Sequence, residues 1–199
     1  MKVLLIGATG TIGSIVEKEM KNEAEIITAG IDQSDITVDL TSTESIQQMY
    51  EQVGEVDAVV NTAGIEHYGS LQEMTPEQNQ VAVQSKLSGQ VNLVLLGMDA
   101  VTDRGSFTLT TGILMDDPIV KGASAAMANG GVRAFVQSAA IEMPRGIRIN
   151  HVSPTILEDS VEKNGHLFQG FESVSSKRVG LAYRKSILGA QTGQGIYVY

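Results

Sequence analysis

Residues 1–13 read MKVLLIGATGTIG, and this stretch decides the fold. Residues 3–6 are a continuous apolar run, which is typical of a strand buried on both faces of a parallel sheet. Gly7, Gly10 and Gly13 follow at once, and apolar residues then recur at helical spacing. The stretch therefore predicts a strand, a tight glycine turn and a helix in direct succession.

The rest of the chain repeats this alternation of short apolar runs and longer amphipathic stretches. Strands are expected near residues 25–29, 36–38, 56–60, 105–111, 146–152 and 195–199. Helices are expected near residues 12–20, 42–53, 76–100, 124–142 and 173–188, with a surface loop at residues 157–171. Such alternation implies a parallel sheet covered on both faces, and right-handed crossovers make it doubly wound. We expect one dinucleotide-binding domain over residues 1–199, a Rossmann-like α/β three-layer sandwich with about seven parallel strands.

The charge and the composition exclude several classes of function. The formal net charge is −9 and the 14 lysines and arginines are scattered, whereas a nucleic-acid or anionic membrane surface needs concentrated positive charge. No cysteine is present, which excludes disulfides, thiol catalysis and cysteine-bound zinc. The three histidines are dispersed, so no metal site is expected. No apolar run approaches the roughly 18 residues of a membrane span, and we expect a cytoplasmic protein.

The glycine turn has the chemistry of a phosphate-binding site. Glycine lets the backbone turn tightly and approach a diphosphate closely, and free N–H groups at a helix start attract negative charge. A simple tight turn between a strand and a helix is the alternative. The strand–turn–helix context favours the first interpretation and predicts a nicotinamide dinucleotide held by Gly7, Thr9, Gly10, Thr11, Ile12 and Gly13.

The cofactor preference depends on the residue that meets the adenosine ribose. An acidic residue about 20 positions beyond the glycine turn can bind the ribose hydroxyl groups. Asp32 lies 19 positions beyond Gly13, and no lysine or arginine occurs in the turn or directly after the second strand. A carboxylate there repels the additional phosphate of NADP, so the residues favour NAD over NADP. A solvated turn residue is the alternative role of Asp32.

Further motifs in the same order resemble the short-chain dehydrogenase/reductase family over nearly the whole chain. GATGTIG matches the family's N-terminal motif, and Asp39-Leu40 resembles its Asp-Leu pair beside the adenine. Asn61, Ala63 and Gly64, within Asn61-Thr62-Ala63-Gly64, resemble its Asn-Ala-Gly motif. Residues 148–150 with Ser153-Pro154 are similar to the strand and Pro-Gly turn that face the nicotinamide, although Thr155 replaces that Gly. Residues 193–199 are similar to the closing strand.

The resemblance is weaker at the positions that carry catalysis. The family uses Asn, Ser, Tyr and Lys, with Tyr and Lys one helical turn apart so that both side chains point the same way. Counting back from Ala140–Glu142 places the Tyr position at Ala125 and the Lys position at Asn129. Thr111 replaces the Ser, and Lys86 replaces the Asn. The resemblance thus implies a retained frame, with Asn129 beside the cofactor ribose and the usual acid missing.

Lys86 and Thr111 are the two candidates for catalysis. A desolvated lysine can exchange protons, so Lys86 is a candidate acid, with a surface or interface lysine as the alternative. Thr111 ends a central strand, where open sheets bind ligands, and an ordinary strand residue is the alternative. Lys121, Tyr183 and residues 67–68 are weaker candidates, for which surface or core roles are the alternatives.

Two functions remain open at this point. The family frame predicts an NAD(P)-dependent oxidoreductase that transfers hydride to or from a small carbonyl or alcohol substrate, with a non-standard proton donor. The missing Tyr and Lys favour instead an inactive NAD(P)-binding sensor or regulatory module. The helices expected at residues 76–100 and 124–142 resemble those of the family's subunit interface, so a homodimer or homotetramer is expected.

Overall fold

The computed structural model describes all residues from 1 to 199. Seven parallel strands form one sheet in the order β3-β2-β1-β4-β5-β6-β7. The strands are β1 (Lys2–Ile6), β2 (Glu25–Gly30), β3 (Ile36–Thr37), β4 (Val56–Asn61), β5 (Val101–Thr110), β6 (Arg148–Pro154) and β7 (Gly195–Val198). The doubly wound α/β fold is therefore confirmed. The order of the strands reverses between β1 and β4, which is where open sheets of this kind form a ligand crevice.

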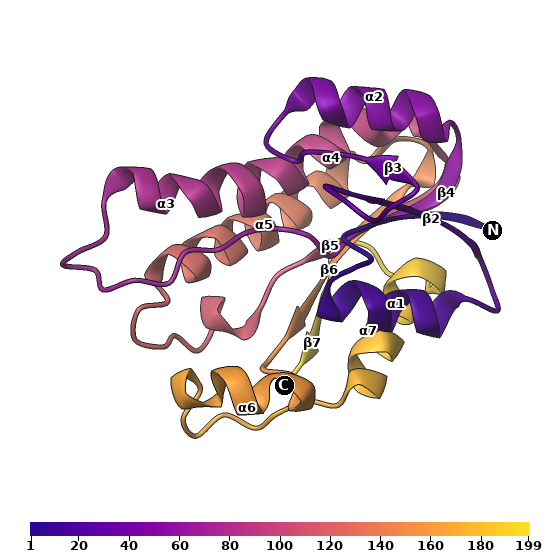
Figure 1. Ribbon diagram of the computed structural model, residues 1–199. Helices are drawn as coiled ribbons and strands as arrows, with labels where there is room; N and C mark the ends of the chain where they lie inside the picture. Colours follow the sequence, from indigo (N-terminus) through magenta and orange to yellow (C-terminus); the bar gives the residue numbers. More distant parts are fainter.

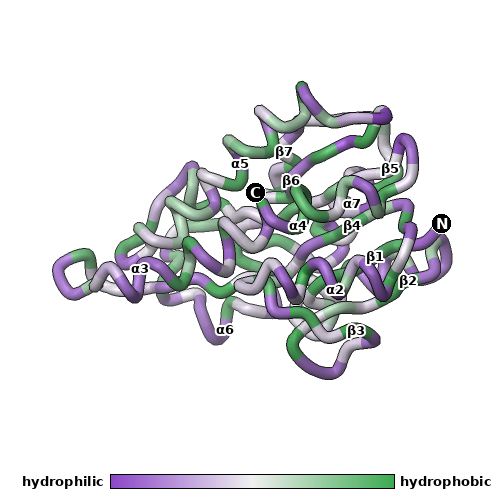
Figure 2. The backbone as a smooth tube through the Cα atoms, turned by 90° about the horizontal axis from the view of Figure 1, so that it is seen from above, coloured by the Kyte–Doolittle hydropathy of each residue, from purple (hydrophilic) through white to green (hydrophobic).

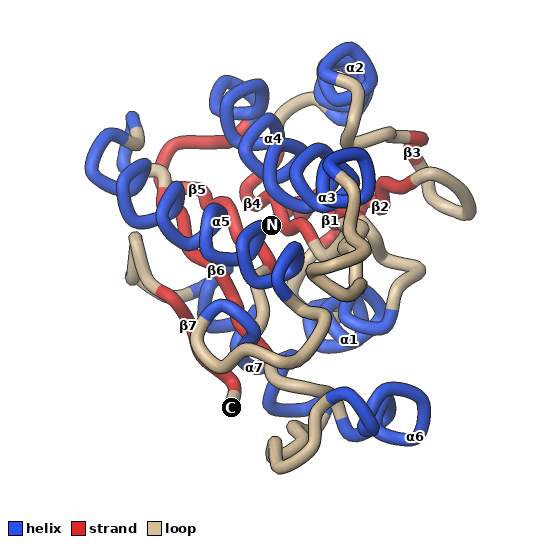
Figure 3. Tube along the Cα trace, turned by 90° about the vertical axis from the view of Figure 1, so that its left-hand side faces the viewer, coloured by secondary structure: helices blue, strands red, loops and turns tan.

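Helices cover both faces of the sheet, as Figures 1 and 3 show from two directions. On one face α1 (Thr11–Met20) packs against α7 (Ser176–Leu188). The opposite face carries α2 (Thr43–Val53), α4 (Gly89–Gly97) and α5 (Ala123–Glu142). None of the helices is long and apolar enough to cross a membrane.

The alternation of side chains along β5 decides which residues face which helical layer. Phe107 and Leu109 lie in the apolar cluster beneath α2, α4 and α5. Thr108 and Thr110 point the other way, to hydroxyl partners on α7. Figure 2 shows hydrophilic and hydrophobic residues alternating along the backbone, as expected for amphipathic elements packed in layers. The same alternation turns the Thr111 side chain toward the α5 layer.

The structure confirms a continuous helical segment over the expected residues 76–100, with a π-helical turn inside it that the sequence did not predict. α3 (Pro76–Ala82) begins with a capping box between Thr75 and Gln78, a π-helical turn η1 spans Val83–Ser88, and α4 follows. A 3₁₀ turn, η2 (Met98–Ala100), leads directly into β5. Beside this turn the side-chain amide of Gln90 donates to the Lys86 carbonyl at 2.9 Å and pairs with both backbone groups of Thr110. These bonds tie the turn that carries Lys86 to the end of β5.

Residues 157–171 are not the plain surface loop that the sequence suggested. They contain three short helical turns, η5 (Glu158–Ser160), α6 (Val161–Asn164) and η6 (Gly165–Leu167). Phe168 and Phe171 stack edge to face, with ring centres 5.5 Å apart, and pack against Ile113 and Leu114. Apolar packing therefore holds this segment over the carboxyl ends of β5 and β6.

Candidate active site

The glycine turn after β1 has a backbone that only glycine can adopt. Gly7 has a φ of +84°, and a Cβ atom there would lie 2.8 Å from the amide nitrogen of Ala63. A Cβ atom on Gly13 would lie 2.0 Å from the carbonyl oxygen of Gly7. Both positions exclude larger residues because the turn, the first helix and the chain after β4 are in direct contact.

The start of α1 presents unpaired backbone donors beside this turn. Gly10 is the N-cap and provides no side-chain hydrogen bond, and the first turn of α1 contains no acidic residue. The N–H groups of Thr11, Ile12 and Gly13 thus lack an acceptor within the helix. Together with the positive end of the helix dipole, these donors suit an anion. The glycine turn leaves open a space that larger side chains would fill, and free N–H groups lie beside it. Both features fit the diphosphate of a dinucleotide.

The chain after β4 braces the glycine turn. The Thr62 hydroxyl donates to the carbonyl oxygens of Ile6 at 2.8 Å and Gly7 at 3.1 Å. The Asn61 side chain is fully buried and donates to the Ala63 carbonyl at 2.7 Å. Asn61 thus shapes the turn of the chain after β4. The backbone of this turn, at Ala63 and Gly64, packs closely against its neighbours.

The residues expected on the adenosine side lie at the other end of the crevice. Asp32 is exposed in the turn after β2, and its carboxylate makes no hydrogen bond within the chain. The Asp39 carboxylate accepts from the backbone N–H of Thr41 at 2.8 Å and from its hydroxyl at 2.7 Å, and these bonds lower the pKa of Asp39. Leu40 is buried and contacts the helix at Gly89. Asp32 therefore has a free carboxylate, whereas Asp39 shapes its own loop.

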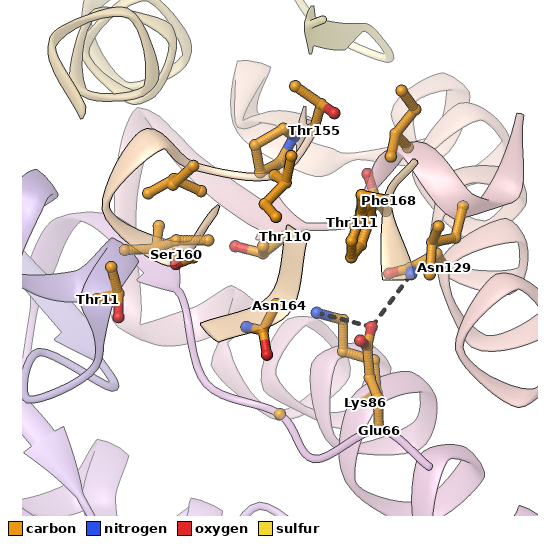
Figure 4. A pocket seen from close by; sticks show the side chains of 18 of the residues that line it. Thr11, Glu66, Lys86, Thr110, Thr111, Asn129, Thr155, Ser160, Asn164 and Phe168 are labelled. Carbon is orange, nitrogen blue, oxygen red and sulfur yellow. Dashed lines mark hydrogen bonds and ion pairs between the residues drawn. The ribbon is translucent and has the colours of Figure 1, made fainter. Parts of the chain in front are cut away.

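A cavity of about 490 Å³ joins the glycine turn to the ends of the central strands (Figure 4). Its walls come from the start of α1, the chain after β4, the turn η1, the segment after β5, α5, and the segment after β6. The lining residues are Thr11, Ile12, Thr62, Gly64, Glu66, Tyr68, Lys86, residues 110–114, Asn129, residues 154–157, Ser160, Asn164, Leu167 and Phe168. The cavity thus brings together Thr11, Ile12, Gly64, Lys86, Thr111, Asn129 and Pro154 from the predicted set.

Lys86 is a buried residue of this cavity, so the alternative of a solvent-exposed lysine does not hold in this chain. Its residue exposure is 8%, and its Nζ atom lies 3.4 Å from Oε1 of Glu66. The same oxygen accepts a hydrogen bond of 3.1 Å from Nδ2 of Asn129. The Tyr68 hydroxyl donates to Oε2 of Glu66 at 2.9 Å. Figure 4 shows Lys86 and Asn129 converging on Glu66 from different elements.

Glu66 is the functional residue that sequence reasoning missed. Burial raises the pKa of Glu66, but the charge of Lys86 and hydrogen bonds from Tyr68, Asn129 and Lys86 together hold that pKa below its usual value. The carboxylate is therefore ionised at neutral pH and pairs with an ammonium group. Only its position after the Asn61–Gly64 motif hinted at the pocket.

The Thr111 hydroxyl is less free than the sequence suggested. It lies 2.7 Å from Nδ1 of His151 and 3.3 Å from the carbonyl oxygen of Val152, and the residue is 3% exposed. Burial lowers the pKa of His151 to about 4, with a further lowering by the charge of Arg133 that outweighs the effect of Asp116. The Thr111 hydroxyl is thus hydrogen-bonded to a neutral imidazole, although Thr111 still lines the cavity.

The remaining predicted positions fall into two groups. Ala125 is fully buried and presents only a methyl group, and Asn129 lies one turn further along α5. Pro154 ends β6 at the cavity, and the N–H of Thr155 donates to the Val198 carbonyl at 3.0 Å. Of the minor candidates, Tyr68 lines the cavity and donates to Glu66, whereas Lys121 is exposed and Tyr183 pairs with Thr110 on the α7 face. No cluster of three or more His, Asp or Glu side chains is arranged to hold a metal ion.

Comparisons with known proteins give the same picture. Residues 7–183 match the family described as enoyl-(acyl carrier protein) reductase. The protein lin1944 from Listeria innocua is 59% identical, with 100% of both chains covered and a TM-score of 0.99. None of the curated proteins matches the chain.

Two more distant solved structures share the fold. A small-chain dehydrogenase in complex with NADPH is 22% identical, with 100% of this chain and 96% of that chain covered and a TM-score of 0.85. The aldohexose dehydrogenase of Thermoplasma acidophilum, in ligand-free form, is 18% identical, with 99% and 91% covered and a TM-score of 0.86. With the match over residues 7–183, the glycine turn and the seven-stranded sheet, the chain belongs to the short-chain dehydrogenase/reductase family.

Proposed function

We propose that residues 1–199 form a single dinucleotide-binding domain that acts as an NAD(P)-dependent oxidoreductase on a small carbonyl or alcohol substrate. One observation carries the proposal: a single cavity connects the free amides at the start of α1 to the buried ammonium of Lys86. The amides of Thr11, Ile12 and Gly13 hold the diphosphate, and the cavity leads from there to the reacting groups.

The proton chemistry falls to Lys86, because Ala125 stands at the position of the family's tyrosine and the hydroxyl of Tyr68, which also lines the cavity, is donated to Glu66. When bound, the nicotinamide supplies or accepts the hydride. In the reducing direction the carbonyl oxygen takes a proton from Nζ of Lys86, and the carbonyl double bond becomes a C–O single bond with a new O–H bond. Lys86 then regains its proton from water. Thr111 forms the wall beside the substrate. Its hydroxyl is hydrogen-bonded to His151 and does not donate to the substrate directly.

The shape of the cavity suggests what kind of molecule it accepts. Beyond Lys86 the wall combines the apolar side chains of Ile113, Leu114, Leu167 and Phe168 with polar groups of Thr155, Ser160 and Asn164. Apolar walls with a few placed polar groups are typical of small-molecule sites. A small carbonyl compound with an apolar substituent fits this arrangement.

We infer a preference for NAD from Asp32, whose free carboxylate would meet the adenosine ribose and repel an additional phosphate. The distant relative crystallised with NADPH supports binding of a nicotinamide dinucleotide by this fold and leaves the choice between the two to experiment. Both nucleotides therefore belong in every binding test.

We also infer self-association into a homodimer or homotetramer. An apolar groove of about 270 Å³ runs between α4 and α5, lined by Val94, Leu95, Met98, Phe135 and Met143 among others. Leu95 is 54% exposed in this groove. A second copy of the chain would cover these side chains.

A test of the function mixes the pure protein with NADH or NADPH and a panel of small aldehydes and ketones. The expected result is a decrease of nicotinamide absorbance that requires both the protein and a carbonyl compound. Saturable nucleotide binding with no turnover of any carbonyl compound, or of any alcohol with the oxidised nucleotide, would instead indicate a sensor.

A further inference from the structure

Glu66 lies where three elements meet at the wall of the cavity. It belongs to the chain after β4, Lys86 to the turn η1, and Asn129 to α5 (Figure 4). Its Oε1 atom forms an ion pair with Lys86 at 3.4 Å and accepts from Asn129 at 3.1 Å, and its Oε2 atom accepts from Tyr68 at 2.9 Å. An ionised carboxylate can only accept hydrogen bonds, so these three donors fix its position and that of the Lys86 ammonium.

The orientation of Asn129 follows from the same contacts. Because Glu66 offers acceptors alone, the Asn129 amide must present its NH₂ group to the carboxylate. Its carbonyl oxygen, Oδ1, is buried and has no hydrogen-bond partner within the chain. A ligand with a donor group, such as a hydroxyl, would satisfy this atom.

The charges of the cavity cancel. Among its 21 lining residues only Glu66 and Lys86 carry a charge, and they form an ion pair. Neither arginine nor a second lysine lines the cavity. An anionic substrate would bring an additional charge beside this ion pair, with no further cationic side chain in the lining to compensate it, and burying an uncompensated charge is costly.

We propose that Glu66 is a positioning and specificity-determining residue: its carboxylate fixes the Lys86 ammonium at the cavity wall and cancels its charge, so that the site accepts uncharged carbonyl compounds and rejects those that carry a carboxylate. The inference rests on the proposed function, because it takes Lys86 to face the substrate. It goes beyond that function in naming the residue that sets the charge of the substrate.

Two probes that differ in one group test the specificity. Phenylacetone and phenylpyruvate share the benzyl ketone and differ in a methyl against a carboxylate. The wild type is expected to reduce phenylacetone in preference to phenylpyruvate. Glu66→Gln keeps the size of the side chain and leaves Lys86 uncompensated, so the ratio of kcat/KM for the two ketones should shift toward phenylpyruvate by about tenfold or more.

Glu73→Gln is the matched control, because Glu73 is an exposed residue of the same loop and undergoes the same chemical change. It should leave the ratio unchanged. An equal ratio in the wild type and in Glu66→Gln would overturn the inference.

The position of Glu66 can also be tested without turnover. NMR titration of the protein with ¹³C-labelled glutamate carboxyl groups should give Glu66 a pKa below the usual glutamate value. In Lys86→Met that pKa should rise, because burial then acts without the compensating charge. If neither ketone is reduced, the proposed function fails and this titration alone decides the positioning role. A Glu66 carboxyl group that titrates identically in both proteins would refute the role.

Discussion

The Nζ atom of Lys86 lies 3.4 Å from Oε1 of Glu66, and this ion pair connects the π-helical turn η1 to the chain after β4. The two side chains are 10% and 18% exposed, so each charge depends on the other for compensation. Asn129 and Tyr68 hold the carboxylate from two further directions. Changes at any of these positions should therefore affect both stability and catalysis.

Lys86→Met should abolish most of the turnover while the cofactor still binds. Loss of a general acid costs about 100-fold or more in rate, and the diphosphate site lies at the other end of the cavity. Steady-state kinetics with NADH and NADPH, together with fluorescence titration of each nucleotide, separate the two effects. Lys121→Met is the control, because Lys121 is exposed and should tolerate the change. Unchanged turnover in Lys86→Met would remove Lys86 from the mechanism.

The same substitution should destabilise the fold through Glu66. Removing one partner of a buried ion pair leaves an uncompensated charge, at a cost of about 3 kcal/mol. The double variant with Lys86→Met and Glu66→Gln removes both charges and should recover most of that loss. Urea unfolding at neutral pH measures both proteins. A double variant no more stable than Lys86→Met would show that the two charges are not coupled.

Thr111→Val should reduce turnover only a few-fold, far less than Lys86→Met. The Thr111 hydroxyl is paired with His151 at 2.7 Å, so its loss breaks a buried hydrogen bond within the chain. The expected decrease in the free energy of unfolding is about 1–3 kcal/mol. Kinetics and urea unfolding of the variant test this, and a loss of turnover comparable to that of Lys86→Met would place the hydroxyl on the substrate.

The stability of the protein should decrease between pH 6.5 and about pH 4 because of His151. Burial lowers the pKa of His151 from 6.5 to about 4, so the unfolded chain binds one more proton than the native state within this window. The contribution is complete above pH 6.5 and is lost as the pH falls, by about 3 kcal/mol in total. Urea unfolding of the wild type and His151→Gln across this range measures it. The variant should show a flatter pH dependence, and parallel curves would contradict the prediction.

Leu95→Glu should produce a monomer if α4 and α5 form the interface. The substitution places a charge in the apolar groove beside Phe135 and Met143. Light scattering of the wild type should give the mass of a dimer or tetramer. A wild type with the mass of one chain, or a variant with unchanged mass, would remove this interface.

Most of the fold follows from local signals in the sequence. The apolar run and glycines at residues 3–13 predict β1, its turn and α1, because a buried parallel strand and a helix start each leave a local pattern. Thr75-Pro76 likewise predicts the start of α3. The π-helical turn within residues 83–88 has no such local signal, and Gln90 beside it is bonded to Thr110, 20 positions away, which no local pattern predicts.

The candidate site was predicted less completely, for a related reason. Asn129 and Glu66 are 63 positions apart, and only the tertiary fold brings them to 3.1 Å. The packing of Phe168 over Leu114 is equally non-local, so residues 157–171 gave no hint of forming a cavity wall. The resemblance pointed to Lys86 and Asn129, which line one cavity in the structure, but it offered no partner for either, since Glu66 lies outside the family motifs quoted from the sequence.

The central claim is that the backbone amides beside Gly13 bind the diphosphate of a nicotinamide dinucleotide. Fluorescence titration of the wild type and Gly13→Val with NADH and NADPH tests it directly, with Gly130→Ala as the control, since a Cβ atom at Gly130 meets nothing within 4 Å. The account predicts saturable binding of at least one nucleotide to the wild type and to Gly130→Ala, and loss of that binding in folded Gly13→Val. Absence of binding of both nucleotides to the folded wild type, or equal binding to Gly13→Val, would contradict it.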